Sequence, residues 1–265
     1  MPRAGTLGDP QPYKFFGRYA GIPFWPGGLT LLAAAPGIGK TSWLLRMIFE
    51  GADAGVPSAI GCYEHTALEL KYRLRCQAEA AVGGPHDQAV AEDTEQFLVR
   101  GAETVLLPLS DQEDTIRCIE DILITDYGFP VNGPALLAVD YLQRIPVIGL
   151  TGRISEDLRA GEAAARLRAL SRKHDWAIIA AAALSKDNFD VGDLDDSVLT
   201  ALLGDERVPY EADRVYVAYQ AGEVQECGCV RLGVHTSKDR TGPKRSWEMN
   251  FWGERFYPSL DTTHP

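Results

Sequence analysis

The sequence predicts an α/β fold, in which a mainly parallel, twisted sheet carries helices on both faces. Two observations predict it. Short apolar runs alternate with longer segments of helical periodicity throughout the 265 residues, and this alternation is typical of parallel strands joined by crossover helices. Two late runs alternate more between apolar and polar residues, which favours antiparallel strands that finish the sheet.

The expected strands and helices follow from these runs in chain order. The strand candidates are 29–35, 58–63, 104–107, 135–140, 177–182 and 214–219, followed by the late runs 230–236 and 246–251. The helices are expected to begin at Lys40, Ala67, Gln112 and Glu156. In the last of them, residues spaced as i, i+4, i+7 and i+11 share one face. These residues are Ala163, Leu167, Leu170 and His174.

Composition limits the possible classes of protein. The apolar content of 45% is ample for a buried core. With 26 basic and 37 acidic residues the net charge is −11, so binding to a polyanion would require a local basic patch. Five cysteines without a CxxC pair favour reduced thiols, and Cys227 and Cys229 are read as strand thiols in preference to a metal pair.

Membrane insertion is not expected. The longest apolar run, 176–184, is far shorter than the ~20 residues that span a bilayer. The start of the chain lacks the apolar core of a signal peptide. We therefore expect a cytoplasmic protein with no membrane partner.

The segment 34–41, AAPGIGKT, follows the Walker A pattern GxxxxGK[ST] with alanine in place of the first glycine. A strand before it and a helix after it are the context of a true phosphate loop. Gly37 and Gly39 allow backbone N–H groups to surround phosphates at the start of that helix. Lys40 is expected to neutralise the β- and γ-phosphates of ATP, and the Thr41 hydroxyl is expected to bind Mg²⁺. The predicted nucleotide-binding residues are Ala35, Pro36, Gly37, Ile38, Gly39, Lys40, Thr41 and Ser42.

Hydrolysis also needs carboxylates, and two candidates end predicted strands. Asp140 ends the apolar run ALLAVD, at the carboxyl edge where open α/β sheets place their sites, and we expect it to be the second metal-binding residue. Glu64 ends the run SAIGCYE directly before a helix rich in charge. From its position alone, Glu64 is either a base that polarises the attacking water or a charge that stabilises a helix N-terminus.

The combination of AAPGIGKTSW, YEHTALELKYRLR, AVDYLQRI and HTSKDRTGP resembles the RecA-fold motor domain of DnaB-like hexameric replicative helicases. The resemblance covers roughly residues 27–257. It implies that Glu64 is the catalytic glutamate. It also implies that Lys238 and Arg240 reach the nucleotide of a neighbouring subunit, where an arginine would stabilise charge on the transferred phosphate. By charge pattern alone, 231–245 is merely a basic, solvated stretch.

Three departures from the family pattern affect what the resemblance implies. Ala183 stands where the family carries a glutamine that senses the γ-phosphate. Either a nearby residue such as Ser185 or Lys186 replaces it, or the coupling between hydrolysis and movement is changed. The segment 186–196, where pore loops are expected, carries one lysine against five aspartates, so Lys186 and Arg207 are the candidate DNA contacts. A leader, 1–27, stands in place of an N-terminal domain and carries Tyr13, Phe15, Phe16 and Tyr19.

The sequence thus predicts a leader (1–27) and one RecA-like P-loop ATPase domain (28–260). The expected function is a DnaB-like helicase or translocase on single-stranded DNA in plasmid or phage replication. Its cofactors would be ATP and Mg²⁺, and its partners further copies of itself in a homo-hexamer or other ring or filament, with other replication proteins. The alternatives are an ATP-dependent assembly switch, a repair, defence or regulatory ATPase without unwinding activity, and a nucleotide-binding module without catalysis.

Overall fold

The structure of the protein, a computed structural model, describes residues 22–81, 104–110, 115–147, 156–184, 199, 202, 206–225, 228–240 and 242–259. Within these ranges the strands are β1 (Leu29–Ala34), β2 (Ser58–Cys62), β3 (Thr104–Pro108), β4 (Leu136–Asp140), β5 (Ala177–Ala183), β6 (Arg214–Val224), β7 (Cys229–Asp239), β8 (Ser246–Trp252) and β9 (Tyr257–Ser259). The helices are α1 (Lys40–Asp53), α2 (Ala67–Ala81), α4 (Ile116–Thr125), α5 (Glu156–His174) and α6 (Arg207–Glu211), with short 3₁₀ turns η1 (Leu142–Arg144) and η3 (Gly253–Arg255).

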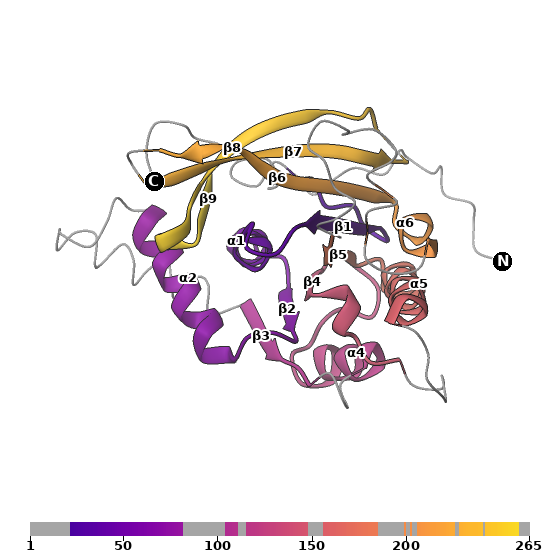
Figure 1. Cartoon of the computed structure of the whole chain (residues 1–265). Coiled ribbons are helices and arrows are strands. Elements are labelled where there is room, and N and C mark those ends of the chain that lie inside the picture. The colour runs from indigo at the N-terminus through magenta and orange to yellow at the C-terminus, as the bar shows by residue number, and fades with distance from the viewer. Residues whose placement is uncertain are drawn as a thin grey trace.

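The described strands form one sheet in the order β3-β2-β4-β5-β1-β6-β7-β8-β9 (Figure 1). The pairs from β3 through β6 are parallel, and those from β6 through β9 are antiparallel. This arrangement confirms the predicted fold class, and each predicted strand corresponds to an observed one. The sequence did not predict β9 or α6, which are three and five residues long and therefore too short for a clear periodicity.

Helices cover the two faces of the parallel strands (Figure 1). Successive side chains of a strand point to opposite faces of a sheet. In β1, Leu31 belongs to the apolar cluster that includes α4 and α5, whereas Leu32 belongs to the cluster that includes α1 and α2. A strand buried on both faces favours apolar residues on both, which explains the apolar run from Leu31 to Ala34 in β1.

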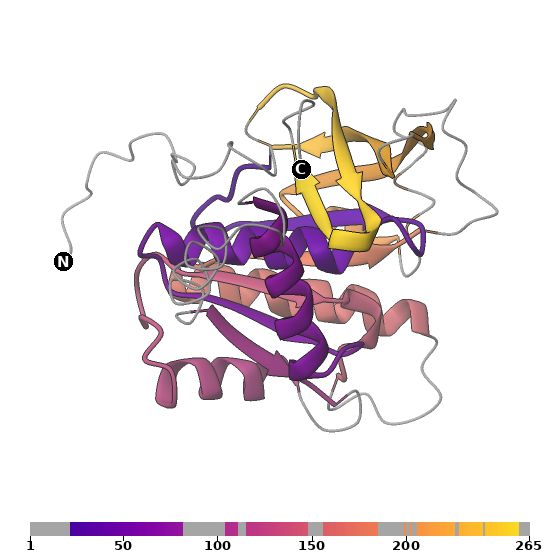
Figure 2. The same ribbon diagram turned by 90° about the vertical axis from the view of Figure 1, so that its left-hand side faces the viewer.

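Helix α1 lies between the parallel strands and the C-terminal strands, which arch over it in both views (Figures 1 and 2). Residues 41–52 of this helix are all buried, and a helix enclosed on all sides is apolar around its whole circumference. The charged residues of this stretch, Arg46 and Glu50, form an ion pair in which Nε and Oε1 lie 2.8 Å apart. The Arg46 guanidinium also lies 5.4 Å from the ring centroid of Tyr257 in β9.

The predicted helices agree with the observed ones. The described part of α4 begins at Ile116, because the hydroxyl of Thr115 accepts the backbone N–H of Cys118 and caps the helix; the predicted start, Gln112, lies outside the described residues. The predicted face of α5, from Ala163 to His174, is buried as expected. In the described part of the chain, no helix combines the length and apolarity needed to cross a bilayer.

Several predictions fall on residues outside the described ranges. These are the leader as far as residue 21 with its four aromatic residues, the acidic segment 186–196 with Lys186, the candidate Ser185, and Cys227.

Candidate active site

The predicted phosphate loop joins β1 to α1 at the carboxyl edge of the parallel strands. Gly37 and Gly39 have φ angles of 87° and 93°, a conformation that is open to glycine and strained for other residues. At Gly39, an added Cβ atom would also lie 2.7 Å from Cζ of Phe251. The two glycines therefore let the loop turn into the amino end of α1, where the helix dipole favours an anion.

Lys40, the first residue of α1, points back across this loop. Its Nζ donates hydrogen bonds to the carbonyl oxygens of Ala34 and Ala35, at 3.0 and 3.1 Å. Burial lowers the pKa of Lys40, and the carboxylates of Asp140 and Glu64 oppose that shift. The ammonium group thus lies inside the loop with both predicted carboxylates near enough to affect it.

Asp140 and Thr41, the two predicted metal-binding residues, are in direct contact. The Thr41 hydroxyl donates to Oδ2 of Asp140 at 2.6 Å, and the Sγ of Cys62 lies 3.7 Å from the same oxygen. Burial and the Asp140 charge raise the pKa of the Cys62 thiol to about 12, so it stays protonated. The Asp140 side chain is 1% exposed, and its Oδ1 has no hydrogen-bond partner among the described residues.

Glu64 follows β2 at the same edge of the sheet and reaches Asp140 in space. One ligand atom each from Glu64, His65 and Asp140 can be chosen so that all three lie within 4.8 Å of one another. The sequence predicted that Glu64 and Asp140 act together, but it did not single out His65. Downstream, Thr66 and Glu69 form a capping box, since each accepts the backbone N–H of the other. This box explains why α2 begins directly after the Glu64 segment.

A cleft of about 500 Å³ lies at this edge of the sheet, and its volume is in the range of small-molecule sites. It is lined by residues of the phosphate loop, Glu64 and His65, whereas Asp140 is buried and contacts the lining residue Thr41. The cleft is also lined by residues that the sequence did not predict, namely Arg73, Tyr141, Phe251, Gly253 and Phe256. The Arg73 guanidinium lies 4.7 Å from the ring centroid of Phe256. Most of these residues come from α2 and from the C-terminal strands and turn. They are far from the phosphate loop in sequence, and folding of the C-terminal strands over α1 brings them to the cleft.

Ala183, which stands at the position of the family's glutamine, lines the cleft at the end of β5. Its backbone N–H donates to Oε1 of Gln143 at 3.2 Å. Gln143 belongs to the AVDYLQRI segment that also carries Asp140, and it ties the ends of two neighbouring strand-to-helix connections together. Residue 183 itself offers no polar side chain to a ligand.

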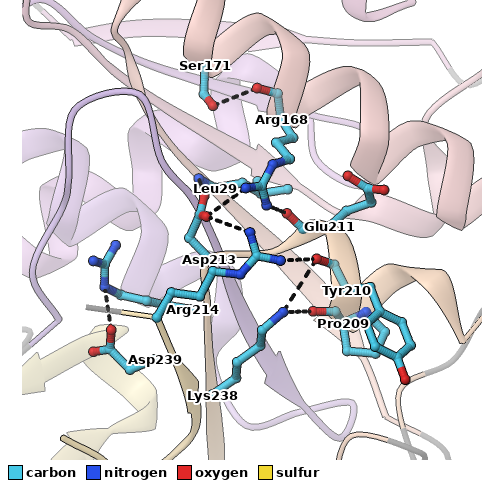
Figure 3. A network of polar contacts seen from close by, with 11 residues as sticks. Leu29, Arg168, Ser171, Pro209, Tyr210, Glu211, Asp213, Arg214, Lys238 and Asp239 are labelled. Atoms are coloured by element: carbon cyan, nitrogen blue, oxygen red, sulfur yellow. Dashed lines mark hydrogen bonds and ion pairs between the residues drawn. The ribbon is translucent and has the colours of Figure 1, made fainter. Parts of the chain in front are cut away.

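Lys238 is not part of the cleft lining and lies in a polar network around Asp213 (Figure 3). Arg240 belongs to the same network. Arg240 donates to Oδ1 of Asp213 at 3.2 Å and to the carbonyl of Tyr210 at 2.6 Å. Arg168 from α5 lies 3.0 Å from the same carboxylate oxygen. Lys238 donates to the carbonyls of Pro209 and Tyr210 in α6. We call Arg168, Asp213, Lys238, Arg240 and Tyr210 the Asp213 network.

The Asp213 network is at the opposite edge of the sheet from the phosphate loop. Oδ2 of Asp213 accepts the backbone N–H of Leu29, the first residue of β1, whereas the loop follows the last residue, Ala34. At about 3.3 Å per residue, roughly 17 Å of strand separates the two ends. Lys238 and Arg240 therefore do not line the cleft of their own chain. Arg207, the candidate DNA contact, is exposed at the start of α6 beside this network.

Burial and the neighbouring Arg240 charge lower the pKa of Lys238 to about 8. Asp213 opposes the shift, and Arg168 adds to it. An amine with this pKa is partly deprotonated near neutral pH. Lys238 therefore loses its positive charge as the pH rises through about 8.

Comparison with known proteins bears on the fold and the family. The family model described as "DnaB-like helicase C terminal domain" matches residues 22–257. A solved structure described as an "ATPase Domain" has a TM-score of 0.71 and 17% identity, over 88% of this chain and 85% of that one. A second, "The Structure Of A DnaB-Like Replicative Helicase And Its Interactions With Primase", has a TM-score of 0.70 and 17% identity, over 86% of this chain and 58% of that one. Among curated proteins, none matches the sequence.

Proposed function

The chain belongs to the family of DnaB-like helicase C-terminal domains and has their RecA-like, ATP-binding fold, and on this premise we propose that it is an ATP-hydrolysing translocase on single-stranded DNA. The observation that carries the proposal is that Lys40, Thr41 and Glu64 line one cleft. The buried Asp140 contacts Thr41 and lies within reach of Glu64. Together they supply what phosphoryl transfer to water requires: a cation for the phosphates, ligands for a metal ion and a carboxylate for the water.

The cleft fits a magnesium nucleotide. A Cβ atom added at Gly37 would meet no heavy atom within 4 Å, so the phosphate loop opens onto free space. Thr41 and Asp140 would hold Mg²⁺, because this ion prefers oxygen ligands and Oδ1 of Asp140 has no partner in the described chain. The bound ion would neutralise charge on the phosphates.

The remaining steps are assigned to side chains of the cleft. Lys40 would exchange its contacts with the Ala34 and Ala35 carbonyls for the β- and γ-phosphate oxygens. Glu64 is exposed at the mouth of the cleft and within reach of Asp140. It would orient a water molecule and accept its proton as the water oxygen bonds to the γ-phosphorus and the bond to the bridging oxygen breaks, which releases ADP and phosphate.

We assign Lys238 and Arg240 to the cleft of a neighbouring copy of the chain. Their place at the edge opposite the phosphate loop supports this, since they cannot reach their own cleft but could face one across a ring or filament contact. Arg240 is 43% exposed, so its guanidinium is open to a second subunit. An arginine placed in this way stabilises negative charge in the transition state and makes hydrolysis depend on assembly.

The proposal extends to the setting of the protein. We propose a homo-hexamer or another ring or filament that acts in the cytoplasm on single-stranded DNA with other replication proteins, in the replication of a plasmid or phage. Arg207 and Lys186 remain the proposed DNA contacts, because cationic groups are required for a nonspecific grip on the phosphate backbone.

ATP hydrolysis at low salt, with and without single-stranded DNA, tests this function. We expect DNA to stimulate hydrolysis by the unmodified chain, and Arg240→Ala to abolish the stimulation. A Lys40→Ala chain serves as the baseline without nucleotide binding. Hydrolysis that equals this baseline under both conditions would contradict the assignment of an ATPase.

A second function is favoured by one feature of the sequence. The segment 186–196 carries five aspartates and one lysine, and negative loops repel a DNA backbone. Together with Ala183 in place of a polar residue, this supports an ATP-dependent assembly switch, or a repair, defence or regulatory ATPase that never unwinds a duplex. Hydrolysis that DNA leaves unchanged while ATP drives assembly would favour this function over the translocase.

A further inference from the structure

His65 has no role in a magnesium nucleotide site. Mg²⁺ takes oxygen ligands and retains water, and it rarely accepts an imidazole. Yet His65 lies between Glu64 and the capping residue Thr66, and it lines the cleft. The set of Glu64, His65 and Asp140, which we call the His65 cluster, offers one nitrogen and two carboxylates. First-row transition metals bind such sets through imidazole and carboxylate together.

The spacing of the His65 cluster is close to that of bound ligands. At metal–ligand distances of about 2.0–2.2 Å, ligand atoms lie roughly 3.4 Å apart in a tetrahedral site. In the structure the three atoms lie within 4.8 Å of one another, so closure requires movements of about an ångström. Glu64 is exposed and His65 is 21% exposed, whereas Asp140 is fixed by Thr41. The two outer ligands can therefore move toward the buried one.

Asp140 supplies a second, independent observation. Its carboxylate is 1% exposed, and while Oδ2 accepts the Thr41 hydroxyl, Oδ1 has no partner in the described chain. A buried carboxylate oxygen without a partner is costly unless it binds a proton, a donor or a cation. The carboxylate that carries this oxygen belongs to the group that also contains Glu64 and His65.

The carboxylate of Glu69 lies near the His65 ring. Oε2 of Glu69 lies 4.0 Å from Nδ1 of the ring, and the N–H and hydroxyl of Thr66 hold that same oxygen at 2.7 and 2.9 Å. A carboxylate near the ring of a metal-binding histidine can orient that ring. The capping box of α2 thus provides this support from local sequence alone.

We propose that Glu64, His65 and Asp140 bind a first-row transition-metal ion, such as Zn²⁺ or Co²⁺, at a site that overlaps the proposed magnesium nucleotide site. The binding itself depends only on the His65 cluster and requires no nucleotide. One consequence rests on the proposed function: a metal held by Glu64 occupies the carboxylate that would act on water, so such ions would inhibit hydrolysis supported by Mg²⁺.

Co²⁺ binding to the full chain tests the proposal, with the protein freed of metal by a chelator and free of any polyhistidine tag. Visible absorption of protein-bound Co²⁺ reports coordination directly, and calorimetry gives the stoichiometry and affinity. We expect one ion per chain that a large excess of Mg²⁺ does not displace. His65→Gln should weaken Co²⁺ binding roughly tenfold or more. His235→Gln is the matched control, since His235 lies on β7 and contacts Ser246, and it should leave the affinity unchanged.

The opposite results overturn the proposal. Equal Co²⁺ affinity in His65→Gln and the unmodified chain would exclude His65 as a ligand, and easy displacement by Mg²⁺ would show a site of oxygen ligands alone. Thermal unfolding of both variants confirms that each is folded. Because the titration contains no nucleotide, its outcome is separate from that of the proposed function: turnover with Mg²⁺ but no Co²⁺ binding rejects this inference alone, and Co²⁺ binding without turnover rejects the ATPase alone.

Discussion

Replacing Gly39 with alanine should destabilise the protein more than the same change at Gly37. Both residues have positive φ angles, 93° and 87°, so each alanine should cost about 1–2 kcal/mol in backbone strain. Only at Gly39 does the new Cβ meet other atoms, at 2.7 and 2.9 Å from Cζ and Cε2 of Phe251. Overpacking of this kind costs about 1–3 kcal/mol. The expected losses are therefore about 2–5 kcal/mol for Gly39→Ala and about 1–2 kcal/mol for Gly37→Ala.

Urea unfolding of the two variants measures this difference, and a double-mutant cycle tests its cause. Phe251→Leu should remove much of the clash, so Gly39→Ala should cost less in that background than in the unmodified chain. A coupling energy of about 1 kcal/mol or more is expected for groups in contact. If Gly39→Ala and Gly37→Ala were equally stable, or if Gly39→Ala and Phe251→Leu were additive, the packing of β8 against the phosphate loop would not be as described.

Three further predictions follow from single contacts. Thr41→Val should lower the free energy of unfolding by about 1.5–3 kcal/mol, because the buried Asp140 carboxylate loses a charged hydrogen bond of 2.6 Å. Thr41→Ser keeps the hydroxyl and should retain most of this stability. If Thr41→Ser lost as much as Thr41→Val, the hydrogen bond would not be the cause. The kcat/KM of ATP hydrolysis should fall above about pH 8, since Lys238 with its lowered pKa loses its charge there; Lys238→Arg should extend activity to higher pH, and an unshifted profile would exclude this lysine. Asp213→Asn should cost about 1–3 kcal/mol in urea unfolding, because Arg168, whose side chain is 9% exposed, loses its counter-charge; a neutral effect would mean that the pair contributes nothing.

Much of the fold was predictable because buried parallel strands leave a local signature. The run at β1 is apolar at each position from Leu31 to Ala34, since α1 packs on one face and α5 on the other. The two shortest elements, β9 and α6, carried no such signal. They depend on contacts made after the chain has folded, as when Tyr257 in β9 packs over Arg46 of α1.

The candidate site also contains residues that the sequence predicted and residues that it did not. The placement of the phosphate loop, Asp140 and Glu64 at one edge of the sheet was predictable because each lies at the carboxyl end of an apolar strand. Phe251 and Phe256 were not, because they line the cleft only when the C-terminal strands close over α1. The sequence signal for His65 was its position directly after Glu64. This signal pointed to a possible metal ligand only once the structure placed Asp140 within reach of both residues.

The placement of Lys238 and Arg240 shows what spacing along a sequence cannot supply. The resemblance implied that they act on a neighbouring subunit, and charge pattern alone favoured a solvated stretch. In the structure they lie at the amino ends of β1 and β6, where Asp213 and the carbonyl of Tyr210 hold Arg240. That position excludes a direct role in the cleft of the same chain and leaves action on another copy as the role to be tested.

The most direct test of the central claim, that ATP is hydrolysed at sites shared between copies of this chain, is hydrolysis by mixtures of two inactive variants. Lys40→Ala removes the cation of the cleft, and Arg240→Ala removes the arginine supplied to a neighbour. Each alone should be inactive, whereas mixed assemblies pair an intact cleft with an intact Arg240, so hydrolysis should return and depend on the mixing ratio. Absence of recovery at every ratio, with mixed assembly confirmed by sedimentation, would contradict shared sites.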